Sequence, residues 1–171
     1  MISDKMTTAL NGQINKELYS AYLYMAMSAS AEDKGVPGIA NWFFVQAQEE
    51  LSHAQRIYHY MIRQSAAVAL EAIDKPVVEA KTPLAMFEKS LEHEQFITSS
   101  IHELVDVATS EKDRATEVFL QWFVNEQVEE EENAGNIIDQ LRLAGDGGSG
   151  LFMIDRELAS RSFVPPAAED A

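Results

Sequence analysis

Glu49-Glu50-Leu51-Ser52-His53-Ala54 stands in the middle of a segment whose apolar residues recur every three or four positions. This spacing predicts a helix from about residue 38 to 64 with one apolar face. Along that face the sequence reads Ile39, Phe43, Gln46, Glu50, His53, Ile57 and Tyr60. The face is apolar at both ends and polar in the middle. A buried lone carboxylate there is unfavourable unless something compensates its charge.

Three more segments show the same pattern, at about residues 4–34, 82–109 and 111–144. The acidic residues in the middle of their apolar faces are Glu17, Glu94, Glu126 and Glu130. Strong helix formers fill all four segments, and no alternating run rich in valine or isoleucine predicts a strand. The sequence therefore predicts an all-α fold made of four long helices.

The connections between these segments predict their arrangement. Two connections are short, near residues 35–38 and 110–111, and each predicts an antiparallel hairpin. The stretch 65–82 is long enough to carry the chain back along a helix, as a bundle with one long crossover requires. We expect residues 1–145 to form this four-helix bundle. Residues 146–171 are expected to belong to the same domain. They contain a short fifth helix, near 151–161, and an exposed tail that begins at Pro165.

The hairpins predict that the acidic residues meet at one level. Antiparallel helices rise equally from their shared turn, so the residue level with Glu17 across the first hairpin is near position 54. Glu50 and His53 lie next to that position. By the same count, Glu94 mirrors about residue 128, between Gln127 and Glu130. One acidic residue per helix at matched depth is much harder to explain by chance than any of them alone.

This acidic layer is typical of a metal centre. Glu50 and His53 are three residues apart and share one helix face. Carboxylates with an imidazole and no thiolate suit iron or manganese, and four glutamates with one histidine can hold two divalent ions between them. Two redox-active ions at such a site can each pass an electron to dioxygen or peroxide. Taken alone, Glu17 or Glu94 is better interpreted as a boundary residue on a solvated face.

Composition excludes several other functions. The chain of 171 residues has 13 Lys+Arg against 28 Asp+Glu, a net charge of −15, which disfavours nucleic acid and anionic membranes as partners. Cysteine is absent, which excludes disulfides, iron–sulfur clusters and cysteine zinc sites. No apolar run reaches about 18 residues, and the N-terminus lacks the layout of a secretory signal. We expect a cytoplasmic protein.

Several residues near the layer have two interpretations. The run from Glu126 to Glu132 is interpreted as a solvated face at its end, at Glu131 and Glu132. Glu126, Glu129 and Glu130, with Glu49, can form a further cation site. Tyr24 is either a core residue or a redox-active phenol. The residues that we interpret as surface or packing residues are Trp122, His59, His93 and His102.

The sequence resembles the non-haem bacterial-type ferritins, members of the ferritin-like di-iron carboxylate family. The motifs that carry the resemblance are Asn15-Lys16-Glu17-Leu18-Tyr19-Ser20-Ala21-Tyr22, Glu49-Glu50-Leu51-Ser52-His53-Ala54, Glu94, Glu126-Gln127-Val128-Glu129-Glu130 and Gly150-Leu151-Phe152-Met153-Ile154-Asp155-Arg156-Glu157-Leu158. The resemblance implies a ferritin-like four-helix bundle with a ferroxidase centre.

The resemblance also implies a role for each site residue. Glu17, Glu50 and His53 would hold a first iron, and Glu50, Glu94 and Glu130 a second, with Glu50 bridging. Gln127 would lie beside the centre and hydrogen-bond an oxygen ligand or a nearby carboxylate, and Tyr24 matches the tyrosine next to the centre. The residues that match a third iron site are Glu49, Glu126, Glu129 and Glu130. Haem is not expected, because Ser52 stands where bacterioferritins carry their haem-ligating methionine, and Gln127-x-x-Glu130 replaces their second Glu-x-x-His.

By the same resemblance, the chain is an iron-storage ferroxidase. It would oxidise Fe(II) with O₂ or H₂O₂ and keep the ferric mineral inside a hollow shell of 24 identical subunits, with the fifth helix packed around the four-fold axes. Two alternatives stay open at this point. One is a di-metal peroxide-scavenging enzyme, catalase-like or rubrerythrin-like, without storage, although the cysteine-rich module usual in rubrerythrins is absent. The other is a non-enzymatic cation buffer.

Overall fold

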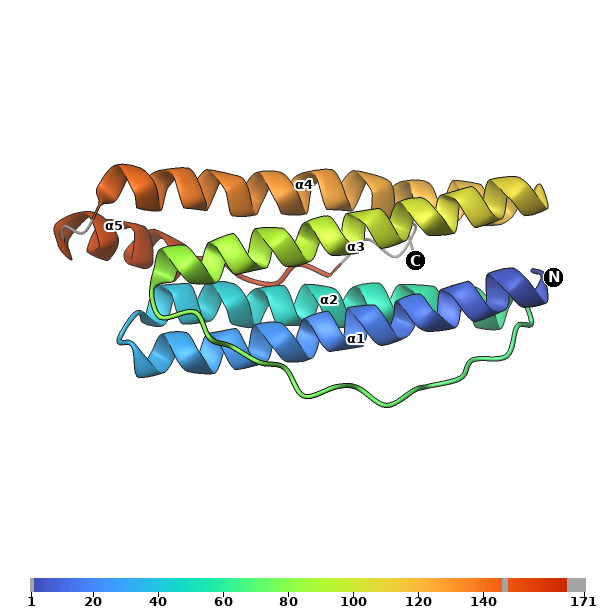
Figure 1. Ribbon diagram of the computed structural model, residues 1–171, viewed down its shortest axis with the longest axis horizontal. Helices are drawn as coiled ribbons and strands as arrows, with labels where there is room; N and C mark the ends of the chain where they lie inside the picture. The colour runs from blue at the N-terminus through green and yellow to red at the C-terminus, as the bar shows by residue number, and fades with distance from the viewer. Residues whose placement is uncertain (1, 146–147, 166–171) are drawn as a thin grey trace.

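The structure is a computed structural model that describes residues 2–145 and 148–165. Its helices are α1 (Asp4–Asp33), α2 (Pro37–Arg63), α3 (Pro83–Glu111), α4 (Arg114–Ala144) and α5 (Gly148–Leu158). Four of them lie side by side in a bundle, with α5 at one end (Figure 1). The described residues contain no strand, and none of their helices is long and apolar enough to cross a membrane. The predicted all-α bundle is confirmed, whereas the tail after Pro165 lies outside the described residues.

Local signals place the helix ends close to where the sequence predicts them. Gly35 adopts φ +73° after α1, and Pro37 opens α2. Thr82 caps α3 by accepting a hydrogen bond from the amide of Ala85 at 3.2 Å. At the other hairpin, Lys112 adopts φ +57° and ends α3, so that α4 begins three residues later than the predicted start near residue 111.

The long crossover determines how the two hairpins face each other. The segment after α2 runs along the outside of α1 for most of the bundle length (Figure 1). Asn11 holds it there by donating to the carbonyl of Ala67 at 3.0 Å and accepting from the amide of Ala69 at 2.8 Å, and Asn15 donates to the carbonyl of Ala72 at 3.0 Å. α3 therefore runs parallel to α2, and the middles of all four helices come to one level.

The fifth helix differs from its prediction. It spans Gly148–Leu158 instead of residues 151–161. A Cβ atom at Gly150 would lie 2.7 Å from that of Ala144, so glycine serves close packing of α5 on the end of α4 rather than breaking the helix. On the other side, Asp155 accepts a hydrogen bond from the amide of Ile39 at 2.9 Å, which fixes α5 to the start of α2.

The buried apolar side chains form two clusters, one toward each end of the bundle. One contains Phe43 and Phe87, whose rings stack with centroids 4.9 Å apart. The other contains Leu10 and Phe123. Polar side chains occupy the level between the clusters, as the interrupted apolar faces predict.

Candidate metal centre

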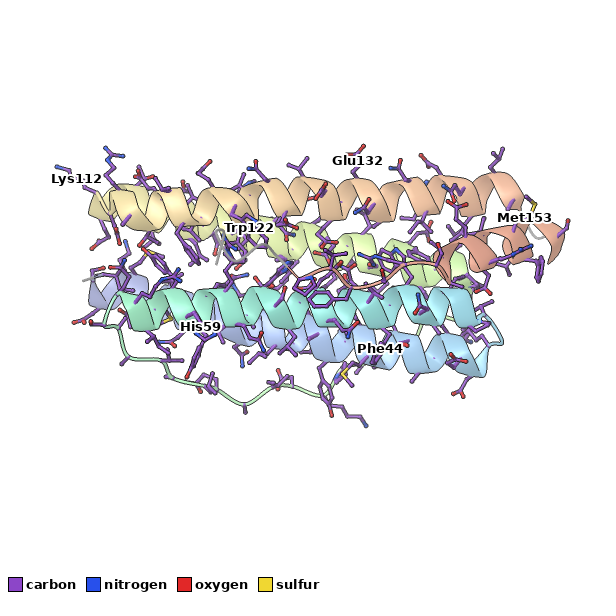
Figure 2. All side chains as sticks on the ribbon, turned by 180° about the vertical axis from the view of Figure 1, so that it is seen from behind. Phe44, His59, Lys112, Trp122, Glu132 and Met153 are labelled. Atoms are coloured by element: carbon purple, nitrogen blue, oxygen red, sulfur yellow. The ribbon has the colours of Figure 1, made fainter. Side chains whose placement is uncertain are left out.

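All four long helices contribute to a polar layer between the two apolar clusters. Each residue of this layer is only 1 to 5% exposed. The layer consists of Glu17, Glu50, His53, Glu94, Gln127 and Glu130. Each helix turns at least one acidic group inward at the same level, because the hairpins place these positions opposite one another. Figure 2 shows the contrast on α4, where Trp122 lies on the side facing α2 and Glu132 projects from the outer side.

Three of these side chains present ligand atoms to a common point. One carboxylate oxygen each from Glu17 and Glu50 and a ring nitrogen of His53 lie within 4.8 Å of one another. Gln13 donates to Oε1 of Glu17 at 2.8 Å, which leaves Oε2 of Glu17 without a hydrogen-bond partner. Oε2 of Glu50 likewise has none. Buried carboxylate oxygens without donors are unfavourable unless a proton or a cation neutralises them, and the convergence of three ligand atoms fits a divalent metal ion.

The other half of the layer is held by donors from neighbouring helices. The Tyr24 hydroxyl donates to Oε1 of Glu94, and Nε2 of Gln127 donates to Oε2 of the same carboxylate at 3.2 Å. Nε2 of Gln46 donates to Oε2 of Glu130 at 2.6 Å. The two carboxylates are thereby fixed in orientation across the layer from Glu17 and Glu50.

The residues proposed from the sequence for a further cation site meet only in part. Glu126 and Glu130 come within 4.8 Å of His53, counting one ligand atom from each. Glu49 is directed elsewhere and pairs with Arg161 at 2.5 Å, and Glu129 is exposed and outside this group. His53, which the sequence assigned to the main centre, therefore belongs both to the group with Glu17 and Glu50 and to the group with Glu126 and Glu130.

Comparisons with known proteins show the family to which the chain belongs. A family model described as a ferritin-like domain matches residues 7–144. The chain belongs to the ferritin-like family. The bacterial non-heme ferritin of Bacteroides fragilis (strain 638R) is 42% identical over 161 residues, covering 94% of this chain and 100% of the relative. That of Campylobacter jejuni is 40% identical over 156 residues, covering 91% and 93%. Among solved structures, an engineered closed form of the Archaeoglobus fulgidus ferritin superposes with a TM-score of 0.94 at 48% identity, covering 96% of this chain and 100% of that one.

The carboxylates of this ferritin-like layer repel one another. Burial raises the pKa of Glu50 well above its usual value, and the charges of Glu94 and Glu17 raise it further. Burial also raises the pKa of Glu94 to about 7, against the opposing effect of the hydrogen bonds from Tyr24 and Gln127. The pKa of Glu130 rises to about 8, again mainly through burial and then through Glu94. Protons or cations must therefore neutralise the layer.

Tyr24 is both a core residue and a neighbour of the centre. It is fully buried, its ring stacks on Phe43 with centroids 6.0 Å apart, and its hydroxyl contacts Glu94 and, at 3.1 Å, Ser90. Burial and the charges of Glu94 and Glu50 raise its pKa well above 10. The phenol is thus neutral and donates its proton toward the carboxylate layer.

The remaining aromatic and histidine residues lie where the sequence predicts. Trp122 packs edge-on against His53, with ring centroids 5.4 Å apart. His93 is a packing residue whose Nε2 lies 2.8 Å from the Ser20 hydroxyl, and burial lowers its pKa to about 4. His59 and His102 are exposed.

Sequence reasoning missed the hydrogen-bonding residues behind the ligands. Lys16 donates to the Ser100 hydroxyl, which donates to Oε1 of Gln13 at 2.5 Å, and Gln13 in turn holds Glu17. A detectable signal was present, because Gln13 precedes Glu17 by four residues and therefore shares its helix face. Gln46 already stood on the inward face of its predicted helix, but its bond to Glu130 on another helix was not predicted. Arg161 gave no such signal, since its partners lie more than 100 positions away in the sequence.

Proposed function

We propose that the protein stores and detoxifies iron, oxidising Fe(II) at a di-iron ferroxidase centre and keeping the ferric product inside a hollow homo-oligomeric shell. The observation that carries the proposal is the buried layer in which Glu17, Glu50 and His53 converge while two carboxylate oxygens lack hydrogen-bond partners. Membership of the ferritin-like family supports iron as the metal. A cytoplasmic location and a chain folded as one domain belong to the same proposal.

The proposed ligands would form two iron-binding positions. Glu17, Glu50 and His53 hold the first Fe(II), and Glu50, Glu94 and Glu130 hold the second, with Glu50 between them. Together, two Fe(II) ions supply two electrons, which with two protons reduce O₂ to H₂O₂ or H₂O₂ to two waters. The ferric ions then hydrolyse, release protons and leave for the cavity. No haem takes part.

Within the centre, the neighbouring donors keep the ligands oriented. Gln13 and Gln46 fix one oxygen each of Glu17 and Glu130, which leaves the second oxygen of each carboxylate for metal. Gln127 lies beside Glu94 and can hydrogen-bond an oxygen species bound at the centre. We expect the neutral Tyr24 to supply one electron toward the reduction of the oxidant, with its proton passing to Glu94.

Assembly into a homo-oligomer, which we take to be a shell of 24 subunits, is supported by the outer surface of the first hairpin. Large apolar side chains are exposed there, namely Tyr22, Met25, Phe44, Leu51, Tyr58 and Ile62. Phe44 is labelled on α2 in Figure 2. Apolar exposure over two adjacent helices is typical of a face that another subunit covers.

Replacement of the bridging ligand tests the enzymatic part of this proposal. Glu50→Ala is expected to abolish rapid Fe(II) oxidation in stopped-flow absorbance while the shell stays assembled, because one residue is lost from both iron positions. Glu132→Ala is the matched control, since that carboxylate is exposed on the same bundle and should leave the rate unchanged. Oxidation at the wild-type rate in Glu50→Ala would refute the centre.

Iron loading followed by size-exclusion chromatography tests storage. Retention of many irons per subunit in a large shell is expected. Rapid peroxide consumption with only about two metal ions retained per subunit would favour a peroxide-scavenging di-metal enzyme. Binding without any acceleration of Fe(II) oxidation would favour a cation buffer.

A further inference from the structure

The segment that follows α5 returns along the bundle instead of leaving it. Residues 159–165 run back between α2 and α4, as both views show (Figures 1 and 2). Asn41 on α2 holds the start of this segment, because its side-chain amide donates to the carbonyl of Leu158 at 3.2 Å and to that of Arg161 at 2.9 Å. The backbone position of Arg161 is therefore set from α2.

Arg161 points its guanidinium group at the edge of the acidic layer. Its NH1 donates to Oε1 of Gln46 at 2.9 Å, and its NH2 donates to Oε2 of Glu49 at 2.5 Å. The group lies over the ring of Trp42, 4.5 Å from the centroid, and the side chain is 21% exposed. A charge-assisted pair that is partly buried and backed by an aromatic ring is much stronger than an open surface ion pair.

This contact explains why Glu49 is missing from the second ligand group. His53, Glu126 and Glu130 converge within 4.8 Å, but Glu49 is not among them, because its carboxylate faces Arg161. Gln46 extends the link inward, since it accepts from Arg161 and donates to Glu130 at 2.6 Å. The arginine thus contacts one residue of the predicted third site directly and another through a single amide.

We propose that Arg161 is a tethered cation that competes with metal for Glu49 and so sets the affinity of the third site. While Arg161 holds Glu49, a metal at His53, Glu126 and Glu130 lacks one carboxylate. When the third site fills, Glu49 must exchange the guanidinium for the metal ion, and residues 159–165 loosen from α2. The side chain of Arg161 contacts Trp42, Gln46 and Glu49, so the competition lowers the metal affinity of the third site. The proposal rests on the proposed function for the identity of the cargo.

Zinc binding to the apo-protein tests the competition without any redox chemistry. We compare wild type, Arg161→Gln and Arg156→Gln by isothermal titration calorimetry with Zn²⁺. Arg156→Gln is the matched control, because it removes one positive charge from an exposed position on α5. Arg161→Gln is expected to tighten the weakest of three Zn²⁺ ions by about tenfold, or to make a third ion detectable, since a charge-assisted hydrogen bond no longer has to be broken. Arg156→Gln is expected to match wild type.

The titration distinguishes a failure of the proposed role of Arg161 from a failure of the proposed di-metal centre. A weakest Zn²⁺ affinity in Arg161→Gln equal to that of wild type, or two bound ions in both, would overturn the role of Arg161. Absence of the two tighter ions in wild type would instead contradict the proposed di-metal centre. The double variant Glu49→Gln/Arg161→Gln is expected to lose the increase in Zn²⁺ affinity, because the carboxylate for which Arg161 and the metal compete is then absent.

A crystal of the wild-type protein soaked in Zn²⁺ gives an independent test that needs no variant. With the third position filled, Arg161 is expected to have moved off Glu49. A third Zn²⁺ bound to Glu49 with the Arg161 contact still intact would overturn the competition.

Discussion

Binding of Zn²⁺ to the apo-protein at pH 7 is expected to release protons from the buried layer. The pKa of Glu94 is about 7 and that of Glu130 about 8, so Glu94 carries about half a proton at pH 7 and Glu130 about 0.9. Metal binds the deprotonated carboxylate, so these two groups release about 1.4 protons per subunit. Glu50, whose pKa is raised well above its usual value, adds to that number. The apparent metal affinity therefore rises with pH.

Calorimetric titration in two buffers of different ionisation enthalpy measures this proton count directly. At pH 8.5 the contribution of Glu94 and Glu130 falls to about 0.3 protons, because both groups are then mostly ionised in the apo-protein. Glu132→Gln serves as the control and should give the wild-type count, since this carboxylate is exposed on α4. A count near zero at pH 7 that does not change at pH 8.5 would refute a desolvated, mutually repelling layer.

Three substitutions probe the supporting structure. Ser100→Ala breaks the hydrogen-bond chain behind the first metal position and is expected to weaken the tightest Zn²⁺ affinity by about tenfold in calorimetry, as loss of a ligand's supporting bond does; an unchanged affinity would contradict this. Tyr24→Phe removes a hydrogen-bond donor to Glu94, a proposed ligand of the second iron, and is expected to slow the fast phase of Fe(II) oxidation by about fivefold or more in stopped-flow absorbance. The helical circular dichroism should stay intact, and a wild-type rate would argue against a role at the centre. Gly38→Ala places a Cβ 1.6 Å from the carbonyl oxygen of Asp155, so it should displace α5 and destabilise the protein by about 1–3 kcal/mol in thermal unfolding. Gly12→Ala is the control, because nothing lies within 4 Å of its Cβ, and it should not destabilise the protein. Equal melting temperatures of the two variants would contradict the close approach of α5 to Gly38.

Much of the fold and the position of the centre follow from short-range regularities. The spacing of apolar residues predicts each long helix, and the hairpin count places Glu17 level with Glu50 because antiparallel helices rise equally from a turn. The fifth helix was misplaced for a physical reason. Gly148 and Gly150 read as helix breakers, but the absence of a side chain at Gly150 is what lets α5 approach α4.

Long-range contacts could not be predicted in the same way. A helix face shows that Gln46 points inward, but not that it bonds Glu130 on another helix. Arg161 follows the fifth helix in a segment without periodicity, so nothing local indicates that it returns to Glu49. Assignments that depend on a neighbouring charge, such as the composition of the third site, therefore need the folded chain.

Anomalous diffraction at the iron edge, from crystals soaked anaerobically in Fe(II), tests the central claim most directly. The expected result is a pair of strong peaks inside the bundle, one bound by Glu17, Glu50 and His53 and the other by Glu50, Glu94 and Glu130. Iron found only at exposed carboxylates, with no density inside the layer, would contradict the di-iron centre.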